Sequence, residues 1–376
     1  MDPEDESLYQ PDPKDIQLML TASNGDLNKC KELITDGADP FFQDIETGMS
    51  VMMAAAGSGF LDIVQLLLDE GAPWNAVDRQ YLCAGDYAAK NGHQAIIDKL
   101  LNFAVISELL LSHAHDIEKI ENAKNPNINN IRNEPTVLNA SYLSSKLEYI
   151  NEESCLADKS TNLAVMMKWE EPLMKQHADY ICHTDIPLSE GPIVLNVGYG
   201  MGIVDSFIQN NSPKSHVVIE AHPEVLHRIK DTGFDKKPGV EICIGRWQDK
   251  VQELESEIAS GKRQPFDGIF FDTYAEDDLD MRHFHEYLPR ILKPKTGRYS
   301  YYNGLCPDNV FFHGVACETM KLLLNQLGLS CNFKSIKIDV SDPEIWKNLA
   351  SRYWYFDTYY LPECRFDSDD QTEMDS

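Results

Sequence analysis

A glycine-rich turn with a carboxylate downstream is the feature of this sequence with the clearest chemical meaning. The turn lies at residues 194–202 and reads VLNVGYGMG. A strand that enters such a turn and a helix that leaves it let backbone amides approach a ligand closely. Glu220 follows Gly200 by 20 residues, at the end of the next apolar segment, where a carboxylate binds ribose hydroxyls. We therefore expect a nucleotide-type ligand at this turn.

The spacing of the glycines indicates which nucleotide is bound. The dinucleotide pattern G-x-G-x-x-G needs a third glycine at position 203, which is Ile203. The observed G-x-G-x-G pattern is instead similar to the first motif of S-adenosylmethionine-dependent methyltransferases. The sequence has no G-K-[ST], which argues against an NTPase whose loop cradles phosphates.

Asp272 is the second acid whose position suggests chemistry. It ends an apolar segment at residues 266–272, FDGIFFD, which we expect to lie beside the strand of the glycine turn. Ligands of open α/β sheets bind at the carboxyl ends of the strands, so the Asp272 carboxylate would face the cofactor. A strand-end aspartate can also cap a helix, and the flanking motifs decide between the two roles.

Strands and helices that alternate along the chain must position these groups. Four apolar segments predict buried strands, with helices between them, at residues 193–197, 217–219, 240–244 and 268–271. This alternation predicts a doubly wound α/β domain with a parallel sheet. Residues 335–339 and 353–361 follow without an intervening helix, so we expect an antiparallel pair at one edge of the sheet.

Glycines also recur near the start of the chain at a nearly constant interval. Gly25, Gly59 and Gly92 are 34 and 33 residues apart, and Gly37 and Gly71 are 34 apart. Ankyrin repeats have a period of about 33 residues, and their stacked helices form a concave face that binds proteins. We therefore expect an all-α ankyrin-like domain that either docks a partner or braces its neighbour.

Composition limits the partners and the location of the protein. The 376 residues carry 33 Lys+Arg and 61 Asp+Glu, a formal net charge of −28, which disfavours nucleic acid and favours basic proteins. The longest apolar stretch, residues 100–111, is too short to span a bilayer. The start lacks the pattern of a signal peptide. We expect a cytoplasmic protein, with the nucleus as a further location, and no membrane or direct nucleic-acid partner.

Metal binding is not expected. The nine cysteines are widely spaced and include no C-x-x-C pair, and the histidines include no H-E-x-x-H. We therefore assign no residue as a metal ligand.

Four motifs together carry a resemblance to a known family. They are VMMKWE at 165–170, VGYGMG at 197–202, GRWQD at 245–249 and FDTY at 271–274. From about residue 142 to residue 365, the chain resembles guanidinoacetate methyltransferases and the related protein arginine N5-methyltransferases. The preceding ankyrin-like repeats favour the arginine-modifying branch.

The resemblance implies a fold and a domain plan. The fold is a Rossmann-like, class I S-adenosylmethionine-dependent methyltransferase domain, of the α/β class, preceded by the all-α repeats. We assign the repeats to residues 1–120, an Asn-rich linker to 121–140, the methyltransferase domain to 141–366 and a disordered acidic tail to 367–376.

The resemblance also implies a reaction and a set of site residues. The reaction is one methyl transfer from S-adenosylmethionine to the internal (δ) nitrogen of an arginine in a protein, with a basic ribosomal protein as one expected substrate. The implied contacts follow the parts of the cofactor. They are, for the methionine part, Gly198, Tyr199, Gly200, Met201, Gly202 and Ile203; for the ribose, Glu220, Ala221 and His222; for the adenine, Trp247 and Gln248; and, in a lid, Tyr142 and Met166.

Two carboxylates suit the chemistry that the resemblance implies. A guanidinium stays protonated and is a poor nucleophile, and a carboxylate can grip it by charge-assisted hydrogen bonds and accept its proton. We assign that role to Asp272, with Glu170 as the second acid. Asn196 stands where the small-molecule enzymes have a Glu, which we expect to remove a negative charge from the guanidine pocket. The alternatives are a methyltransferase of small guanidines and a non-catalytic ankyrin adaptor.

Overall fold

The computed structural model describes residues 11–123, 136–184 and 190–367. The chain divides into two compact units, Met1–Lys119 with Asn309–Thr319 and Ile120–Asp308 with Met320–Ser376. Most of the predicted linker and nearly all of the predicted tail lie outside the described residues, and the predicted domain boundaries stay predictions. No helix in the described ranges is both long and apolar enough to cross a membrane.

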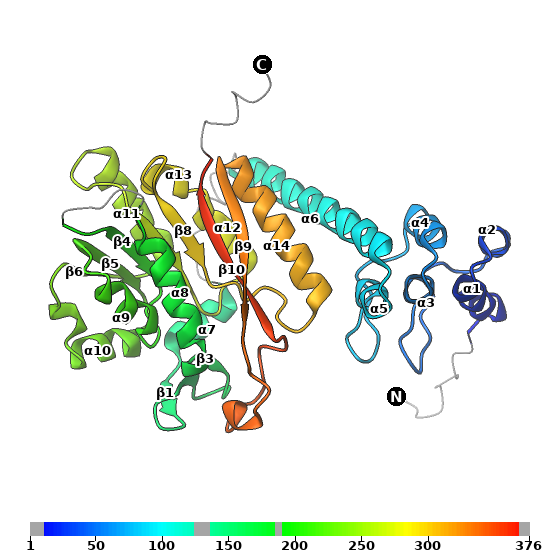
Figure 1. Cartoon of the computed structure of the whole chain (residues 1–376), viewed down its shortest axis with the longest axis horizontal. Coiled ribbons are helices and arrows are strands. Elements are labelled where there is room, and N and C mark those ends of the chain that lie inside the picture. Colours follow the sequence, from blue (N-terminus) through cyan, green and yellow to red (C-terminus); the bar gives the residue numbers. More distant parts are fainter. Residues whose placement is uncertain (1–10, 124–135, 185–189, 368–376) are drawn as a thin grey trace, which may run out of the picture. The chain divides into compact units, whose positions relative to one another are not determined.

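The first unit consists of short helices that follow one another in pairs, drawn in blue and cyan in Figure 1. The helices are α1 (Pro13–Asn24), α2 (Leu27–Thr35), α3 (Val51–Ser58), α4 (Leu61–Asp69), α5 (Ala84–Lys90) and α6 (Gln94–Ala123), of which the last begins in this unit. The glycines that recur in the sequence stand at equivalent turns of successive repeats, where the backbone is left-handed, as at Gly25 (φ 82°) and Gly59 (φ 89°). Residues with a Cβ atom are strained in this backbone conformation, and this explains why glycine stands at these positions.

Hydrogen bonds between neighbouring repeats repeat the same interval. The Gln43 side chain donates to the carbonyl of Val77 at 3.1 Å, and the Asn91 side chain donates to the carbonyl of Gly57 at 2.8 Å. In both pairs the residues are 34 positions apart, so each bond joins one repeat to the next. The predicted repeat architecture is confirmed.

The beginning of α14 (Val310–Gln326) belongs to this first unit. Phe311 and Val315 are buried in the hydrophobic core of the repeats. The Asn309 side chain donates to the carbonyl of Tyr81 at 3.0 Å and to the carboxylate of Asp86 at 2.6 Å. The repeats therefore complete their core with residues from far along the chain.

The second unit is built on a sheet of seven strands in the order β6-β5-β4-β7-β8-β10-β9. The strands are β4 (Ile193–Val197), β5 (Ser215–Glu220), β6 (Val240–Ile244), β7 (Gly268–Phe271), β8 (Arg298–Tyr301), β9 (Leu329–Lys337) and β10 (Thr358–Phe366). Strands β4 to β8 pair in parallel, and β10 pairs antiparallel with both β8 and β9. The chain order reverses between β4 and β7, which makes their carboxyl ends a switch point where ligands bind.

Helices cover both faces of this sheet (Figure 1). Along β4, Val194 packs on one face in a cluster with α8 and α9, and Leu195 packs on the other face with α11 and α13. The helices are α8 (Glu171–Cys182), α9 (Ile203–Asn210), α10 (Pro223–Asp231), α11 (Trp247–Ala259), α12 (Asp278–His285) and α13 (Leu288–Ile291), and the 3₁₀ turns are η2 (Lys168–Glu170), η3 (Phe234–Lys236) and η4 (Pro343–Trp346).

The predicted doubly wound α/β domain is confirmed, with differences at one side of the sheet. The last two strands do form an antiparallel pair; they overlap the predicted residues 335–339 and 353–361 but are displaced along the chain, and β10 lies inside the sheet with β9 at its edge. Strand β8 was not predicted, because its segment, RYSY, has no apolar run.

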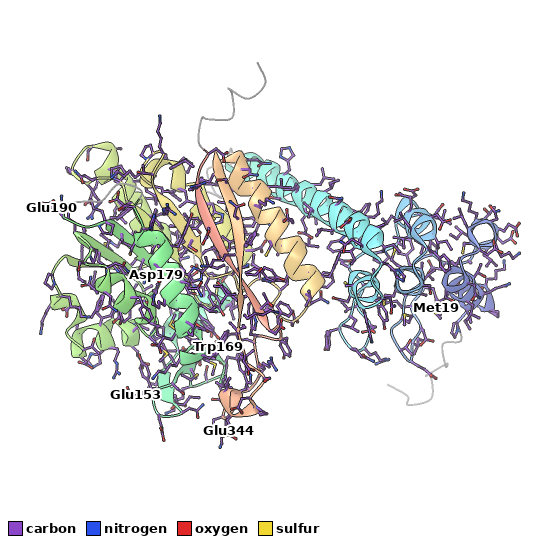
Figure 2. All side chains as sticks on the ribbon, viewed as in Figure 1. Met19, Glu153, Trp169, Asp179, Glu190 and Glu344 are labelled. Carbon is purple, nitrogen blue, oxygen red and sulfur yellow. The ribbon has the colours of Figure 1, made fainter. Side chains whose placement is uncertain are left out.

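A smaller antiparallel sheet precedes the seven-stranded sheet along the chain. Its strands are β1 (Leu147–Ile150), β2 (Cys155–Asp158) and β3 (Ala164–Met167), and helix α7 (Val137–Ser144) precedes them. The side chain of Asn151 donates to the carbonyl of Lys347 at 2.8 Å, which ties the β1–β2 turn to the segment after η4. Figure 2 shows Glu153 of this turn and Glu344 of η4 at the same end of the unit.

Candidate active site

The glycine turn lies against the segment that follows β7. Gly198 has φ 95°, and a Cβ atom there would lie 1.9 Å from the backbone oxygen of Asp272. Only glycine lets the two chain segments approach this closely. The turn after β4 and the acid after β7 are therefore brought together at the switch point of the sheet, as predicted.

A cavity, which we call the turn cavity, opens beside Gly198 and Gly200. Its walls come from α7, the small sheet, the glycine turn and the ends of β5, β6 and β7. The lining residues are Asn139, Tyr142, Leu143, Val165, Met166, Val197, Gly198, Gly200, Ile219, Glu220, Ala221, Gly245, Arg246, Trp247, Asp272, Thr273, Tyr274 and Glu276. The lining combines backbone of glycines with apolar, aromatic and acidic side chains.

Glu220 presents its carboxylate at the wall of the turn cavity. It accepts hydrogen bonds from the backbone N–H of Tyr199 at 2.9 Å and of Ala221 and His222 at 2.7 Å each. Burial raises the pKa of Glu220, and the bonds from these N–H groups act in the opposite direction. The backbone N–H of Gly200 also acts on this carboxylate, so Glu220 ties the glycine turn to the end of β5 at the wall of the cavity.

Aromatic side chains of α7 and of the segment after β7 line one wall of the turn cavity. The Tyr142 ring lies 4.8 Å from the His222 ring and 4.8 Å from the Tyr274 ring. The His222 ring nitrogen Nε2 bonds the backbone oxygen of Tyr142 at 3.1 Å. His222 therefore fixes Tyr142 of α7 from outside the lining, and Tyr142 itself lines the cavity.

Met166 of β3 packs on the glycine turn from the small sheet. Its sulfur accepts a hydrogen bond from the backbone N–H of Met201 at 3.3 Å. A Cβ atom at Gly200 would lie 3.0 Å from the same sulfur. Met166 thus fixes the small sheet against the turn.

Glu276 is a lining residue that was not predicted from the sequence. Its carboxylate accepts hydrogen bonds from Trp247 Nε1 at 2.7 Å, from Gln248 Nε2 at 2.9 Å and from the Thr273 hydroxyl at 2.7 Å. Burial raises the pKa of Glu276, and these bonds oppose the rise. The signal was present, because an acid stands four residues after Asp272 in the FDTYAE run, but no motif assigned it a role.

A second cavity, which we call the acid cavity, adjoins the first. Both cavities are lined by Val165, Asp272, Thr273 and Tyr274. The remaining lining residues of the acid cavity are Leu163, Ala164, Glu170, Tyr302, Gly304, Pro307, Ser351, Tyr353 and Trp354. Asp272 therefore stands at the junction of the two cavities, and Glu170 lies in the acid cavity alone.

The environment of Asp272 favours its protonated form near neutral pH. Burial raises the pKa of Asp272 to about 7, and the negative charge of Asp205 adds to the rise. Its Oδ2 atom is buried and has no hydrogen-bond partner among the described residues. A carboxyl group with such a pKa can exchange a proton at physiological pH.

Glu170 is held by a chain of aromatic side chains. It is 4% exposed, and its Oε1 accepts a hydrogen bond from the hydroxyl of Tyr353. That hydroxyl accepts a bond from Trp169 Nε1 at 3.0 Å, and Figure 2 marks the position of Trp169. Burial raises the pKa of Glu170 well above its usual value, and the charge of Asp272 raises it further.

Some predicted site residues do not line the turn cavity. Tyr199, Met201, Gly202 and Ile203 line a separate depression on the other side of the turn, and His222 and Gln248 are buried behind the wall. The structure brings into the turn cavity Tyr142, Met166, Gly198, Gly200, Glu220, Ala221, Trp247 and Asp272. The roles of all these residues remain predictions.

The expectation that residue 196 faces the guanidine pocket is wrong. Asn196 is fully buried and lines neither cavity; its side chain donates to Asp205 at 2.8 Å and to the carbonyl of Gly198 at 2.9 Å. Successive residues of a strand point to opposite faces, and Asn196 points toward α9. The acid that shares the acid cavity with Asp272 is Glu170.

Comparison with known families matches each unit separately. Residues 142–306 match the family model described as guanidinoacetate N-methyltransferase. Residues 18–108 match the model for ankyrin repeats in three copies. The glycine turn, Glu220, Glu170 and Asp272 all fall within the first match.

Three relatives are each named protein arginine N-methyltransferase 2. The protein from Aspergillus oryzae is 30% identical over 94% of this chain and 97% of its own length. The protein from Cryptococcus neoformans is 33% identical over 92% of this chain and 94% of its own length. The protein from Yarrowia lipolytica is 36% identical, over 60% of this chain and 47% of its own length.

Proposed function

Because the chain belongs to the family of protein arginine N-methyltransferase 2, we propose that it methylates the internal (δ) nitrogen of an arginine in a protein substrate. The proposed donor is S-adenosylmethionine, and one methyl group is transferred to each arginine. The relatives support a methyltransferase that acts on arginine; the nitrogen, the single methyl group and the cofactor are our proposals.

One observation carries the proposal: Asp272 lies at the junction of the turn cavity and the acid cavity. A methyl donor in the first cavity and an arginine side chain in the second would meet at this carboxylate. Holding two reactants in line in this way supplies much of the rate of a transfer reaction.

The turn cavity has the chemistry that S-adenosylmethionine requires. Gly198 and Gly200 expose backbone, Glu220 presents a carboxylate for ribose hydroxyls, and Trp247 and Ile219 supply apolar surface for an adenine ring. When bound, this cofactor supplies a methyl group on an activated sulfonium. Tyr142 and Tyr274 are placed to cover the site and exclude water.

The acid cavity is suited to a guanidinium. A guanidinium carries five N–H donors and no acceptor, and the cavity offers the carboxyl groups of Glu170 and Asp272. Burial and the charge of Asp272 raise the pKa of Glu170, and a bound cation would stabilise the ionised forms of both acids. The positive charge of the substrate is thus matched by the acids that grip it.

Asp272 is the group that would take the proton of the attacking nitrogen. Arginine stays protonated in proteins, so its internal nitrogen must lose a proton as it forms the bond to the methyl carbon. With a pKa of about 7, the Asp272 carboxylate can accept this proton near neutral pH. Glu170, which lies only in the acid cavity, would bind the two terminal nitrogens and leave the internal nitrogen at the junction.

The first unit bears on the choice of substrate. Residues 11–114 contain 15 Asp+Glu and 6 Lys+Arg. Acidic surfaces increase the encounter rate with basic proteins, and ankyrin repeats bind proteins. We therefore propose that this unit docks a basic protein substrate, such as a ribosomal protein, in the cytoplasm or the nucleus.

A second candidate is methylation of a small guanidine. The match of residues 142–306 to guanidinoacetate N-methyltransferase favours it. Because Asn196 lies outside both cavities, the lack of a Glu at this position does not argue against a small guanidine as substrate. Competition decides between the two, since a small guanidine that is a true substrate would be consumed at low concentration.

Methyl transfer with matched variants tests the proposal. The full chain is incubated with methyl-labelled S-adenosylmethionine and basic proteins, and Asp272→Asn is compared with Asp179→Asn, whose side chain is exposed on α8 (Figure 2). We expect label on arginine with the wild type and with Asp179→Asn, and a loss of at least 100-fold with Asp272→Asn, the usual contribution of general acid–base catalysis. Absence of label on arginine with the wild type would refute the proposed function.

A further inference from the structure

The hydroxyl of Tyr302 is a polar group that the proposed mechanism does not yet use. Tyr302 lines the acid cavity together with Glu170 and Asp272. Its Oη atom is shielded from solvent and has no hydrogen-bond partner in the part of the chain that the structure describes. Buried polar groups are nearly always hydrogen-bonded, and an exception at a cavity wall points to a ligand as the missing partner.

The structure holds Tyr302 in place. Its backbone N–H donates to the carbonyl of Phe271 at 2.9 Å, directly before Asp272 in the chain. Its ring stacks on the Tyr359 ring, with centroids 5.8 Å apart and planes 29° apart. The Tyr302 hydroxyl therefore has a fixed position in the wall.

The stacking partner is itself anchored. The Tyr359 hydroxyl bonds His177 Nε2 at 3.0 Å and accepts a hydrogen bond from the backbone N–H of Asn303 at 2.8 Å. His177 is fully buried, and its other ring nitrogen bonds the Ser300 hydroxyl at 2.8 Å. This network fixes the end of β8, and with it the side of the acid cavity that carries Tyr302.

The two acids of the cavity act on Tyr302 directly. Burial raises the pKa of Tyr302 well above its usual value, and the charges of Glu170, Tyr359 and Asp272 raise it further. The phenol therefore stays neutral, with an oxygen that can accept hydrogen bonds. The hydroxyl-bearing Tyr302 therefore lines the acid cavity beside the two carboxyl groups of Glu170 and Asp272.

The other tyrosine of the cavity is already engaged. The Tyr353 hydroxyl donates to Glu170 and accepts from Trp169 Nε1 at 3.0 Å. By contrast, both Tyr302 Oη and Asp272 Oδ2 lack a partner among the described residues. Each of these two atoms can accept a hydrogen bond from an incoming group rich in N–H donors.

We propose that Tyr302 is a substrate-binding residue whose hydroxyl oxygen accepts an N–H of the arginine guanidinium. Glu170 and Tyr302 bind the terminal nitrogens, and Asp272 binds the internal nitrogen at the junction with the turn cavity. Three acceptors fix the guanidinium plane, so the internal nitrogen faces the methyl donor. This inference rests on the proposed function and extends it to the choice of nitrogen.

Binding without methyl transfer tests the role of Tyr302. The probe is N-acetylarginine amide, titrated by calorimetry into the full chain in the presence of S-adenosylhomocysteine, with N-acetyllysine amide as the chemical control. Tyr302→Phe removes only the hydroxyl and keeps the ring on Tyr359. The matched control is Tyr180→Phe, which removes a hydroxyl that donates to the Cys364 carbonyl at 3.0 Å and lines neither cavity.

We expect Tyr302→Phe to bind the arginine probe about 10-fold more weakly or worse, as loss of a hydrogen bond to a charged group predicts. Its affinity for S-adenosylhomocysteine and its melting temperature should equal those of the wild type. Tyr180→Phe should bind the probe as the wild type does.

The inference is overturned if Tyr302→Phe binds the probe with wild-type affinity, if it loses S-adenosylhomocysteine to the same extent, or if the wild type does not prefer the arginine probe over the lysine probe. One combination of results distinguishes failure of the proposed function from failure of this inference. Weaker probe binding by Tyr302→Phe, with no labelled arginine from the wild type, would remove the proposed function and leave the guanidinium site in place.

Discussion

Replacing Asp272 by Asn should make the protein more stable above neutral pH while it abolishes methyl transfer. Burial raises the pKa of Asp272 from 3.8 to about 7. A carboxyl group whose pKa is higher in the folded than in the unfolded state does not destabilise the fold at low pH, where it is protonated in both states. Its unfavourable contribution therefore begins above pH 3.8, grows as the pH rises, and levels off above about pH 7.

The size of the effect follows from the same pKa. The difference between 3.8 and about 7 corresponds to an upper limit of about 4 kcal/mol, at about 1.4 kcal/mol per pH unit. Between pH 5 and pH 8, linkage gives about 2.6 kcal/mol of this, and partial solvent access to the side chain lowers the expectation to about 1–2 kcal/mol. The neighbouring Glu170 adds in the same direction, because removal of the Asp272 charge lowers the pKa of Glu170.

Urea unfolding at pH 5 and pH 8 measures this difference. Four of the five tryptophans lie in the second unit, so tryptophan fluorescence reports mainly on that unit. The free energy of unfolding of Asp272→Asn, minus that of the wild type, should increase by about 1–2 kcal/mol from pH 5 to pH 8. For the exposed control Asp179→Asn this increase should be absent. An Asp272→Asn variant that is equally or more destabilised at pH 8 than at pH 5 would refute the assignment of a raised pKa to Asp272.

Three further predictions address the site, the turn and the docking surface. The kcat/KM for the arginine substrate should fall below about pH 7, because Asp272 must be ionised to accept a proton; a pH-independent kcat/KM between pH 5.5 and 8 would contradict its role as the base. Gly198→Ala should abolish S-adenosylmethionine binding or folding of the second unit, since its Cβ would lie 1.9 Å from a backbone oxygen. The control Gly233→Ala, with φ 68° and no atom within 4 Å, should lose only about 1 kcal/mol by denaturation and retain cofactor binding by calorimetry. Raising the salt from about 50 to 300 mM should increase the KM for a basic protein substrate several-fold and leave that for N-acetylarginine amide nearly unchanged, if the acidic first unit attracts the protein.

Periodic features of the sequence predicted much of the fold. The turn glycines keep an interval of 34 or 33 residues because each repeat ends its helices with a left-handed residue, which is a local requirement. Apolar runs predicted most of the parallel strands, because strands that are buried on both faces need apolar side chains on both. Strand β8 carries Arg, Tyr and Ser instead, and so escaped recognition.

Features that depend on distant contacts could not be predicted. Phe311 and Val315 complete the core of the repeats from a position about 200 residues downstream of α6, with no local signal. A truncation that removes the repeats would therefore expose these apolar side chains. Substitutions on the surface of the repeats are the better test of whether this unit docks a protein substrate. Tyr302 joins the acid cavity through packing on Tyr359, which no short motif encodes.

The placement of Asn196 shows where a family motif misleads. The resemblance aligns Asn196 with a Glu of the small-molecule enzymes, so position 196 was expected to belong to the guanidine pocket. The alternation of side chains along β4 instead turns Asn196 toward α9 and Asp205. By contrast, Glu170 and Asp272 were predicted in sequence, and the structure places both in the acid cavity.

The position of the methyl group on the product tests the central claim most directly. The full chain is allowed to methylate a basic protein with S-adenosylmethionine, and the modified arginine is identified by fragmentation in a mass spectrometer, which separates internal from terminal nitrogens. A junction between the cavities at Asp272 predicts a single methyl group on the internal nitrogen. Methyl groups on a terminal nitrogen, or two methyl groups on one arginine, would contradict this account.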